Sequence, residues 1–225
     1  FKKNILMIVH LGMTGKFIIR RKDRLNQKTS FYYQTENVNE KHNRIEFSFY
    51  SKINIIYNDI RKFGFIKILN TNKINDSKHF KNLGPEPLSK KLNFRYFKNF
   101  LIRKKRTIKD LLMDQRFISG LGNIYVNEVL YKSKVKPSRN VSKLNDLEIK
   151  RIIHYIKKIL KKAIIFGGSS IKDFSNSAGK LGKFQQHFNV YGKKDIKCSN
   201  TDCNGVIKKI AISGRSSFFC PKCQK

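Results

Sequence analysis

Acidic side chains are scarce in this sequence. Asp and Glu together number 15 against 49 Lys and Arg, so 225 residues carry a formal net charge of +34. A chain this positive attracts polyanions and binds them in a salt-dependent way. The abundant Asn and Ile indicate the bias of an AT-rich genome, which adds Lys but does not by itself deplete Asp and Glu. The imbalance therefore favours a nucleic-acid partner.

Long apolar runs are also missing. No stretch of about 18 apolar residues is present, which argues against a membrane span. No basic amphipathic segment stands apart from the expected fold, so an anionic membrane surface is the weaker alternative partner. The sequence starts at Phe1 without an initiator Met or the features of a signal peptide. We expect an intracellular protein whose true N-terminus is missing.

Cysteine is rare and confined to one place. Its four residues fall within 26 positions, with four residues between the first two, sixteen in the middle and two between the last two: Cys198, Cys203, Cys220 and Cys223. This is the two-knuckle spacing of a zinc ribbon. Two disulfides are the alternative, but nothing indicates secretion. We expect one structural Zn²⁺, since four thiolates leave no coordination position open for chemistry.

The periodicity predicts an α+β fold. Runs rich in Ile, Phe, Val and Tyr predict strands in the first third, at 5–11, 16–21, 44–51, 53–58 and 65–69. Helices are predicted at 92–103, 107–114, 123–132 and 144–166, and two hairpin strands at 207–212 and 216–219. In the longest helix we expect one apolar stripe, formed by Ile149, Ile152, Ile153, Ile156, Ile159, Leu160, Ala163 and Ile164.

Three segments carry residues suited to nucleic-acid contact, and each has a plainer alternative. Gly120-Leu121-Gly122-Asn123 opens a helix and either clamps a phosphate or is a simple turn. Gly214-Arg215-Ser216-Ser217 lies between the cysteine pairs, where Arg215 either contacts phosphate or is solvated. Arg61 and Phe63, with Met13 as a third residue, either enter a duplex or pack internally.

These segments belong to a longer ordered series. It comprises His10-Leu11-Gly12-Met13-Thr14-Gly15, Asp59-Ile60-Arg61-Lys62-Phe63-Gly64, Leu83-Gly84-Pro85-Glu86-Pro87-Leu88, Gly120-Leu121-Gly122-Asn123-Ile124-Tyr125, Gly167-Gly168-Ser169-Ser170, Val190-Tyr191-Gly192 and Gly214-Arg215-Ser216. From about His10 to Lys225 the series resembles the bacterial formamidopyrimidine-DNA glycosylase (Fpg/Nei) family. The order of the motifs carries the resemblance, because none is decisive alone.

The resemblance implies a domain organisation. We expect an incomplete N-terminal β-sandwich at 1–69, a linker at 70–90, a helix–two-turn–helix domain at 91–192 and a β-hairpin zinc finger at 193–225. Within the helical domain, the loop 169–183 corresponds to the family's lesion-capping loop. The resemblance further implies a monomer that works in the bacterial cytoplasm and associates with the nucleoid when bound to DNA.

The resemblance also implies residue roles. Met13, Arg61 and Phe63 match the trio that fills the gap left by a flipped-out base, with Arg61 facing the orphaned cytosine. Asn123 and Arg215 match the pair that pinches phosphates beside the lesion, and Arg215 also matches the proton donor for δ-elimination. Further matches to DNA-contacting positions are His42, Lys104 and Lys109.

The implied activity is excision of oxidised purines (8-oxoguanine and formamidopyrimidines) from double-stranded DNA. Cleavage of the abasic site by β,δ-elimination through a Schiff base follows. The family's nucleophilic N-terminal proline, the adjacent glutamate and an assisting lysine would all lie upstream of Phe1. We therefore expect the fragment to be inactive alone. Smaller departures are Ile60 for a usual Pro, Lys62 for a usual Arg, and the longer first cysteine pair.

Two other functions remain open at this point. A non-catalytic module would bind damaged DNA without cleaving it. An endonuclease VIII-type glycosylase would prefer oxidised pyrimidines, although the trio and the Ser/Gly-rich loop favour purine lesions. A generic zinc-ribbon protein acting on RNA or in transcription is a more distant alternative, because it needs neither the 59–64 nor the 120–123 segment.

Overall fold

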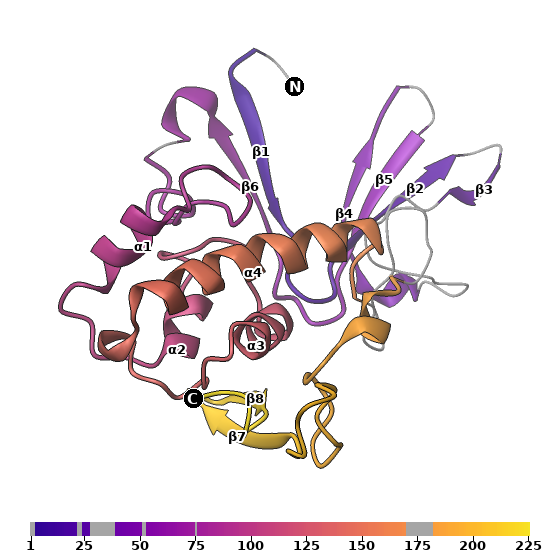
Figure 1. Cartoon of the computed structure of the whole chain (residues 1–225). Coiled ribbons are helices and arrows are strands. Elements are labelled where there is room, and N and C mark those ends of the chain that lie inside the picture. The colour runs from indigo at the N-terminus through magenta and orange to yellow at the C-terminus, as the bar shows by residue number, and fades with distance from the viewer. Residues whose placement is uncertain (1–2, 22–23, 28–38, 51–52, 75, 170–181) are drawn as a thin grey trace. The chain divides into compact units, whose positions relative to one another are not determined.

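The computed structural model describes residues 3–21, 24–27, 39–50, 53–74, 76–169 and 182–225 (Figure 1). The chain forms two compact units. The first comprises residues 1–77 and 165–186, and the second comprises residues 78–164 and 187–225.

The first unit is built from antiparallel strands. β1 (Ile5–His10) pairs with β6 (Phe65–Asn70), and a four-stranded sheet has the order β3 (Arg24–Gln27), β2 (Lys16–Arg21), β5 (Ile53–Asn58), β4 (Asn43–Ser48). β5 is an inner strand, and its Ile56 and Tyr57 are buried in the core of this unit. Short 3₁₀ turns lie at η1 (Glu40–His42) and η2 (Thr71–Lys73).

All the predicted strands are present, some with shifted ends, and β3 is an additional strand that was not predicted. Its sequence, Arg-Leu-Asn-Gln, has no apolar alternation, so pairing with β2 rather than local preference forms this strand. The predicted strand at 44–51 ends earlier, at Ser48, where the Phe49 N–H donates to the Ile53 carbonyl instead of continuing the ladder.

The second unit contains helices α1 (Phe94–Leu101), α2 (Ile108–Met113), α3 (Asn123–Lys132) and α4 (Asp146–Ile165), with a 3₁₀ turn η3 (Val141–Lys143). Side chains cap three of the helices: Asn93 caps α1, and Thr107 caps α2. At α4, Asn145 and Glu148 each accept the other's backbone N–H at 2.8–2.9 Å, a reciprocal capping box. The core between α2 and α3 is fully buried around Leu111, Leu112, Val126 and Leu130.

The apolar stripe of α4 is narrower than predicted. Its buried members step by three and four residues, at Ile149, Ile152, Ile156, Ile159 and Ala163. Ile164 was expected on this stripe but is 66% exposed. Successive residues of a helix are rotated by about 100°, so Ala163 occupies the inward position and Ile164 points away from it.

Two antiparallel strands, β7 (Lys208–Ile212) and β8 (Arg215–Phe219), form a hairpin between the cysteine pairs. The connecting residues Ser213 and Gly214 have φ of 48° and 71°. Two-residue hairpin loops with both central φ values positive match the twist of the strands. The turn therefore places Arg215 at the start of β8, with an exposed side chain.

A final 3₁₀ turn, η4 (Phe184–His187), follows the predicted lesion-capping loop. Ser169 and Lys183 form an antiparallel bridge at the base of that loop, while residues 170–181 lie outside the described residues. Among the helices that the structure describes, none is long and apolar enough to cross a membrane.

Candidate metal centre and nucleic-acid interface

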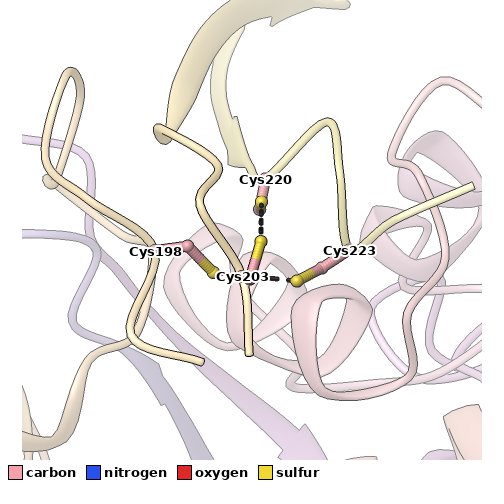
Figure 2. A group of neighbouring side chains, drawn as sticks. All are labelled: Cys198, Cys203, Cys220 and Cys223. Atoms are coloured by element: carbon pink, nitrogen blue, oxygen red, sulfur yellow. Dashed lines mark hydrogen bonds between the residues drawn. The ribbon is translucent and has the colours of Figure 1, made fainter. Parts of the chain in front are cut away.

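The four cysteine side chains converge on one point (Figure 2). All four Sγ atoms lie within 4.8 Å of one another, with Cys198 and Cys223 at 3.7 Å and Cys203 and Cys220 at 3.6 Å. A tetrahedron of thiolates around zinc at about 2.3 Å has edges of about 3.8 Å. A disulfide would require about 2 Å. The donor set thus fits one structural Zn²⁺ and excludes the disulfide alternative.

Neighbouring polar groups hold the thiolates in place. The Tyr131 hydroxyl of α3 lies 3.2 Å from the Cys198 Sγ, and the Gly205 N–H donates to the Cys203 Sγ at 3.3 Å. Gly205 has no room for a side chain, because a Cβ there would lie 2.6 Å from the Cys220 Sγ. Such contacts orient metal ligands and affect metal affinity.

A buried carboxylate on α3 anchors the chain leading to the first cysteine pair. Glu128 is 1% exposed and accepts four N–H bonds at 2.8–2.9 Å. Three come from the backbone of Asn189, Val190 and Tyr191, and the fourth comes from the Asn189 side chain. This explains why the Val190-Tyr191-Gly192 motif lies against the helix.

In the first unit, one carboxylate joins two turns that are far apart in sequence. Asp59 is 1% exposed. It accepts hydrogen bonds from the Thr14 hydroxyl at 2.5 Å, the Gly64 N–H at 3.0 Å and the Tyr57 hydroxyl at 3.1 Å. The Arg61 N–H donates to both Asp59 and Thr14. Burial alone would raise the pKa of Asp59, but these hydrogen bonds outweigh it and hold the pKa below its ordinary value.

This arrangement brings Met13, Arg61 and Phe63 together. The Arg61 guanidinium lies 3.2 Å from the Met13 Sδ and stacks 4.6 Å from the centre of the Phe63 ring. Met13 and Phe63 are 53% and 59% exposed. Their exposure excludes the internal-packing alternative, because neither side chain is buried. A Met and a Phe directed into solvent beside an Arg are suited to contact with stacked bases.

In the second unit, Lys109 and Asn123 hold β8. The Lys109 Nζ donates to the Ser216 carbonyl at 2.7 Å and to the Ser217 hydroxyl at 2.6 Å. The Asn123 side-chain amide donates to the same carbonyl at 3.2 Å. Asn127, one turn further along α3, accepts the Phe218 N–H at 2.7 Å. The hairpin that carries Arg215 is therefore fixed directly to α2 and α3.

Lys109 is 1% exposed, unlike an ordinary phosphate-contacting lysine. Burial lowers its pKa from 10.5 to about 8; nearby Asp110 raises the pKa and Arg215 lowers it. Its observed contacts show that it positions the hairpin. The predicted contact of Lys109 with DNA stays a prediction.

Arg215 borders a cavity of about 370 Å³ that sequence reasoning did not anticipate. Arg106, Arg116 and Lys109 also line it, together with Asp110 and Asp114. Hydrogen bonds from Arg116 and Arg106 hold the pKa of Asp114 well below its ordinary range, so this carboxylate is ionised and orients both guanidinium groups. The run of cations at 103–106 was the available signal for Arg106, whereas Arg116 had none.

The glycine segment before α3 leaves the helix N-terminus open. Gly120 has φ of 77°, a conformation that favours glycine, and its N–H donates to the Gln115 side chain. Gly122 holds the N-cap position and so offers no side chain to the first-turn amides. A Cβ at Gly122 would meet nothing within 4 Å. An anion can therefore approach these amides closely.

The other two predicted contacts lie near these clusters. The His42 carbonyl accepts the Asp59 N–H at 3.0 Å, so His42 neighbours the Asp59 cluster within the first unit. The Lys104 Nζ lies 5.5 Å from the centre of the Phe100 ring in the second unit. The predicted site residues thus fall into two groups, one in each unit.

Comparisons with known proteins agree with this architecture. Three family models match: the formamidopyrimidine-DNA glycosylase N-terminal domain at residues 1–66, its H2TH domain at 83–175, and the zinc finger found in FPG and IleRS at 196–225. The formamidopyrimidine-DNA glycosylase of Rickettsia felis is 40% identical over 224 residues, covering 100% of this chain and 75% of the relative.

Solved structures give the same result. A complex of Lactococcus lactis Fpg with DNA containing an abasic site has a TM-score of 0.81 and 35% identity, covering 98% of this chain and 75% of that one. MutM in complex with DNA containing carbocyclic 8-oxo-G has a TM-score of 0.81 and 34% identity, covering 99% of this chain and 76% of that one.

The β-rich unit, the helix–two-turn–helix region and the zinc-binding hairpin together define a DNA glycosylase of base-excision repair. Within that class, the identity to relatives across nearly the whole chain is decisive. The chain belongs to the formamidopyrimidine-DNA glycosylase family, whose members combine glycosylase and lyase activities.

Proposed function

We propose that the protein binds duplex DNA at oxidised purines, with Met13, Arg61 and Phe63 filling the gap that the everted base leaves. The observation that carries this proposal is the exposed trio held on Asp59. The exposed Arg61 guanidinium can donate to an orphaned cytosine, and Phe63 offers an exposed ring for stacking. Everting a base costs a few kcal/mol, which such contacts offset.

We further propose that Asn123, Arg215 and the open N-terminus of α3 grip the phosphates beside the lesion. His42, Lys104 and Lys109 complete this set of DNA-binding residues, and Arg215 serves as the proton donor for δ-elimination. Support comes from the shared attachment of Asn123 and Lys109 to the Ser216 carbonyl, next to Arg215. The same proposal includes the division into 1–69, 70–90, 91–192 and 193–225, and action on the bacterial nucleoid.

Binding to paired duplexes tests the proposal. Wild-type protein should bind a duplex with an abasic-site analogue opposite cytosine at least tenfold more tightly than the undamaged duplex. Phe63→Ala should remove most of that preference. Ile68→Ala is the matched control, because Ile68 is an apolar side chain of the same unit and is 61% exposed. Equal affinity of wild-type protein for both duplexes would overturn the proposal.

A binding-only role is the second candidate. If the polypeptide only binds, incubation with an 8-oxoguanine duplex and borohydride will trap no covalent adduct, while binding persists. A trapped adduct would exclude the binding-only role for this polypeptide.

A further inference from the structure

A second cavity, of about 640 Å³, lies in the second unit against the zinc centre, and the ligands Cys203 and Cys223 form part of its wall. None of the proposed DNA-binding residues lines it. Four cations do: Lys134 from the turn after α3, Arg151 from α4, and Lys222 and Lys225 from the second cysteine pair and the residues after it. Cations from three separate segments thus converge on one hollow.

Negative groups offset those cations, because two carboxylates and the zinc tetrathiolate, which carries a net charge of −2, line the same cavity. Glu148 is 6% exposed, and one of its oxygens already accepts the Asn145 N–H and lies 3.4 Å from the Arg139 guanidinium. Asp202 is the second acid on the wall and is exposed. The cavity as a whole therefore has no excess of positive charge, although its four cations are held by no direct ion pair with the described residues.

A row of cations continues from the cavity along α4. Arg151, Lys158 and Lys161 are exposed, and their spacing of seven and three residues places them on one side of the helix. At about 1.5 Å per residue, the row is about 15 Å long. These three side chains form no ion pair or hydrogen bond with residues that the structure describes. The buried stripe of α4 uses other positions, so packing does not account for this row.

We propose that this surface is a second contact for duplex DNA, which binds the phosphodiester backbone independently of sequence and away from the lesion. We call it the α4 tract; its members are Lys134, Arg151, Lys158, Lys161, Lys222 and Lys225. The proposal rests on the proposed function only in taking DNA as the ligand. In Figure 1 α3 lies between α4 and the β7–β8 hairpin, whereas the C-terminus, which is Lys225 of the tract, lies beside the hairpin.

The shape and length of the tract favour DNA over other anions. Duplex DNA carries one negative charge per about 1.7 Å, so a 15 Å row faces several phosphates at once. A small anion cannot span a row of this length. A flat membrane surface would engage the row but not a concave cavity, although Leu147 and Ile165 near the helix ends are exposed.

The test compares two triple variants with equal loss of charge. Arg151→Ala/Lys158→Ala/Lys161→Ala removes the row, and Lys81→Ala/Lys90→Ala/Lys91→Ala removes three exposed lysines elsewhere in the same unit. Each is measured on a 12-base-pair duplex with an abasic-site analogue, on the same short duplex without damage, and on an undamaged 60-base-pair duplex. All substituted side chains are exposed, and circular dichroism checks that both variants fold.

The tract variant should bind the long duplex about tenfold more weakly than wild-type protein. Its slope of log affinity against log salt should be smaller by about 2 to 3, since each lost phosphate contact changes the slope by about 0.9. The control variant should change the affinity for the long duplex and the salt slope by much less. Both triple variants should bind the short lesion duplex like wild-type protein. Equal effects of the two triple variants on the long duplex would overturn the proposal.

Vesicles containing phosphatidylserine distinguish the membrane alternative. Loss of vesicle binding in the tract variant, with unchanged binding to the long duplex, would reassign the tract to membranes and contradict the proposal. Failure of wild-type protein to prefer the short lesion duplex over its undamaged counterpart would instead count against the proposed function alone.

Discussion

At the scale of single residues, Asp59 organises the surface that the proposal assigns to DNA. Its carboxylate joins the Thr14 turn to the Arg61–Gly64 turn through four donors. The sequence alone predicted that Met13, Arg61 and Phe63 act together, because their motifs match the family. It did not predict that Asp59 holds them, because a hydrogen-bond acceptor shared by distant turns leaves no periodic signal.

Asp59→Asn should therefore weaken both the fold and lesion binding. The amide replaces one acceptor with a donor facing other donors, which costs about 1–3 kcal/mol in the free energy of unfolding. Urea unfolding and affinity for the abasic-site duplex measure the two effects. Asp76→Asn, at an exposed position of the same unit, should change the stability by less than about 0.5 kcal/mol. Wild-type values for both quantities in Asp59→Asn would contradict this role.

Gly205 is the second residue whose identity the structure explains. A Cβ there would lie 2.6 Å from the Cys220 Sγ and 3.1 Å from the Cys203 Sγ, so Gly205→Ala must displace the thiolates. Zinc affinity should fall about 10- to 100-fold, the usual effect of disturbing the groups around metal ligands. Competition with a chromophoric chelator measures this. Asn204→Ala, on the same loop with an exposed side chain, should retain wild-type affinity.

At the scale of elements, regular periodicity made most of the fold predictable. Helix α3 and strands β2 and β5 were predicted at their observed bounds, because flanking glycines or alternating apolar residues mark their ends. β3 was not predictable, since its formation depends on its neighbour β2. The attachment of β8 to α2 could not be predicted either, because the sequence does not distinguish the buried Lys109 from the many exposed lysines.

Lys109 gives this attachment a pH dependence. Its pKa is about 8 in the fold and 10.5 ordinarily, so between these values the unfolded chain binds more protons than the folded chain. The contribution of Lys109 to the free energy of unfolding therefore rises with pH across this window, by up to about 3 kcal/mol. Lys109→Met should abolish the rise, whereas Lys81→Met should keep it.

Chemical unfolding at pH 7.5, 9 and 10 measures this dependence. Because Lys109 loses its charge above pH 8, DNA affinity of wild-type protein should fall over the same range, and Lys109→Met should show a smaller fall. A wild-type free energy of unfolding that decreases relative to Lys109→Met between pH 8 and 10 would show that burial does not lower this pKa.

At the scale of the whole molecule, the zinc centre supports the proposed phosphate grip. The hairpin between the cysteine pairs carries Arg215 and is fixed to α2 and α3. Cys220→Ser, or removal of zinc by a chelator, should therefore lower DNA affinity at least tenfold along with metal content. Metal analysis and duplex binding on the same samples test this. Wild-type DNA affinity in zinc-free protein would show that the phosphate contacts do not depend on the metal.

The family and the zinc ligands were predictable from the sequence because both depend on residue identity at fixed spacing. The charged cavities could not be predicted in this way. The cavity lined by Arg116 and the α4 tract each bring together cations from segments separated by many residues. A chain with 49 Lys and Arg offers too many candidates for spacing to select among them.

Helix α3 holds the segment 189–218 through four polar side chains: Asn123, Asn127, Glu128 and Tyr131. During synthesis on the ribosome, α3 emerges before its partners at 189–218. Until residues 189–191 are made, the Glu128 carboxylate therefore lacks the four N–H donors that it has in the folded protein. Zinc loading needs all four cysteines, so a nascent chain can complete its metal centre only after Cys223 has left the exit tunnel.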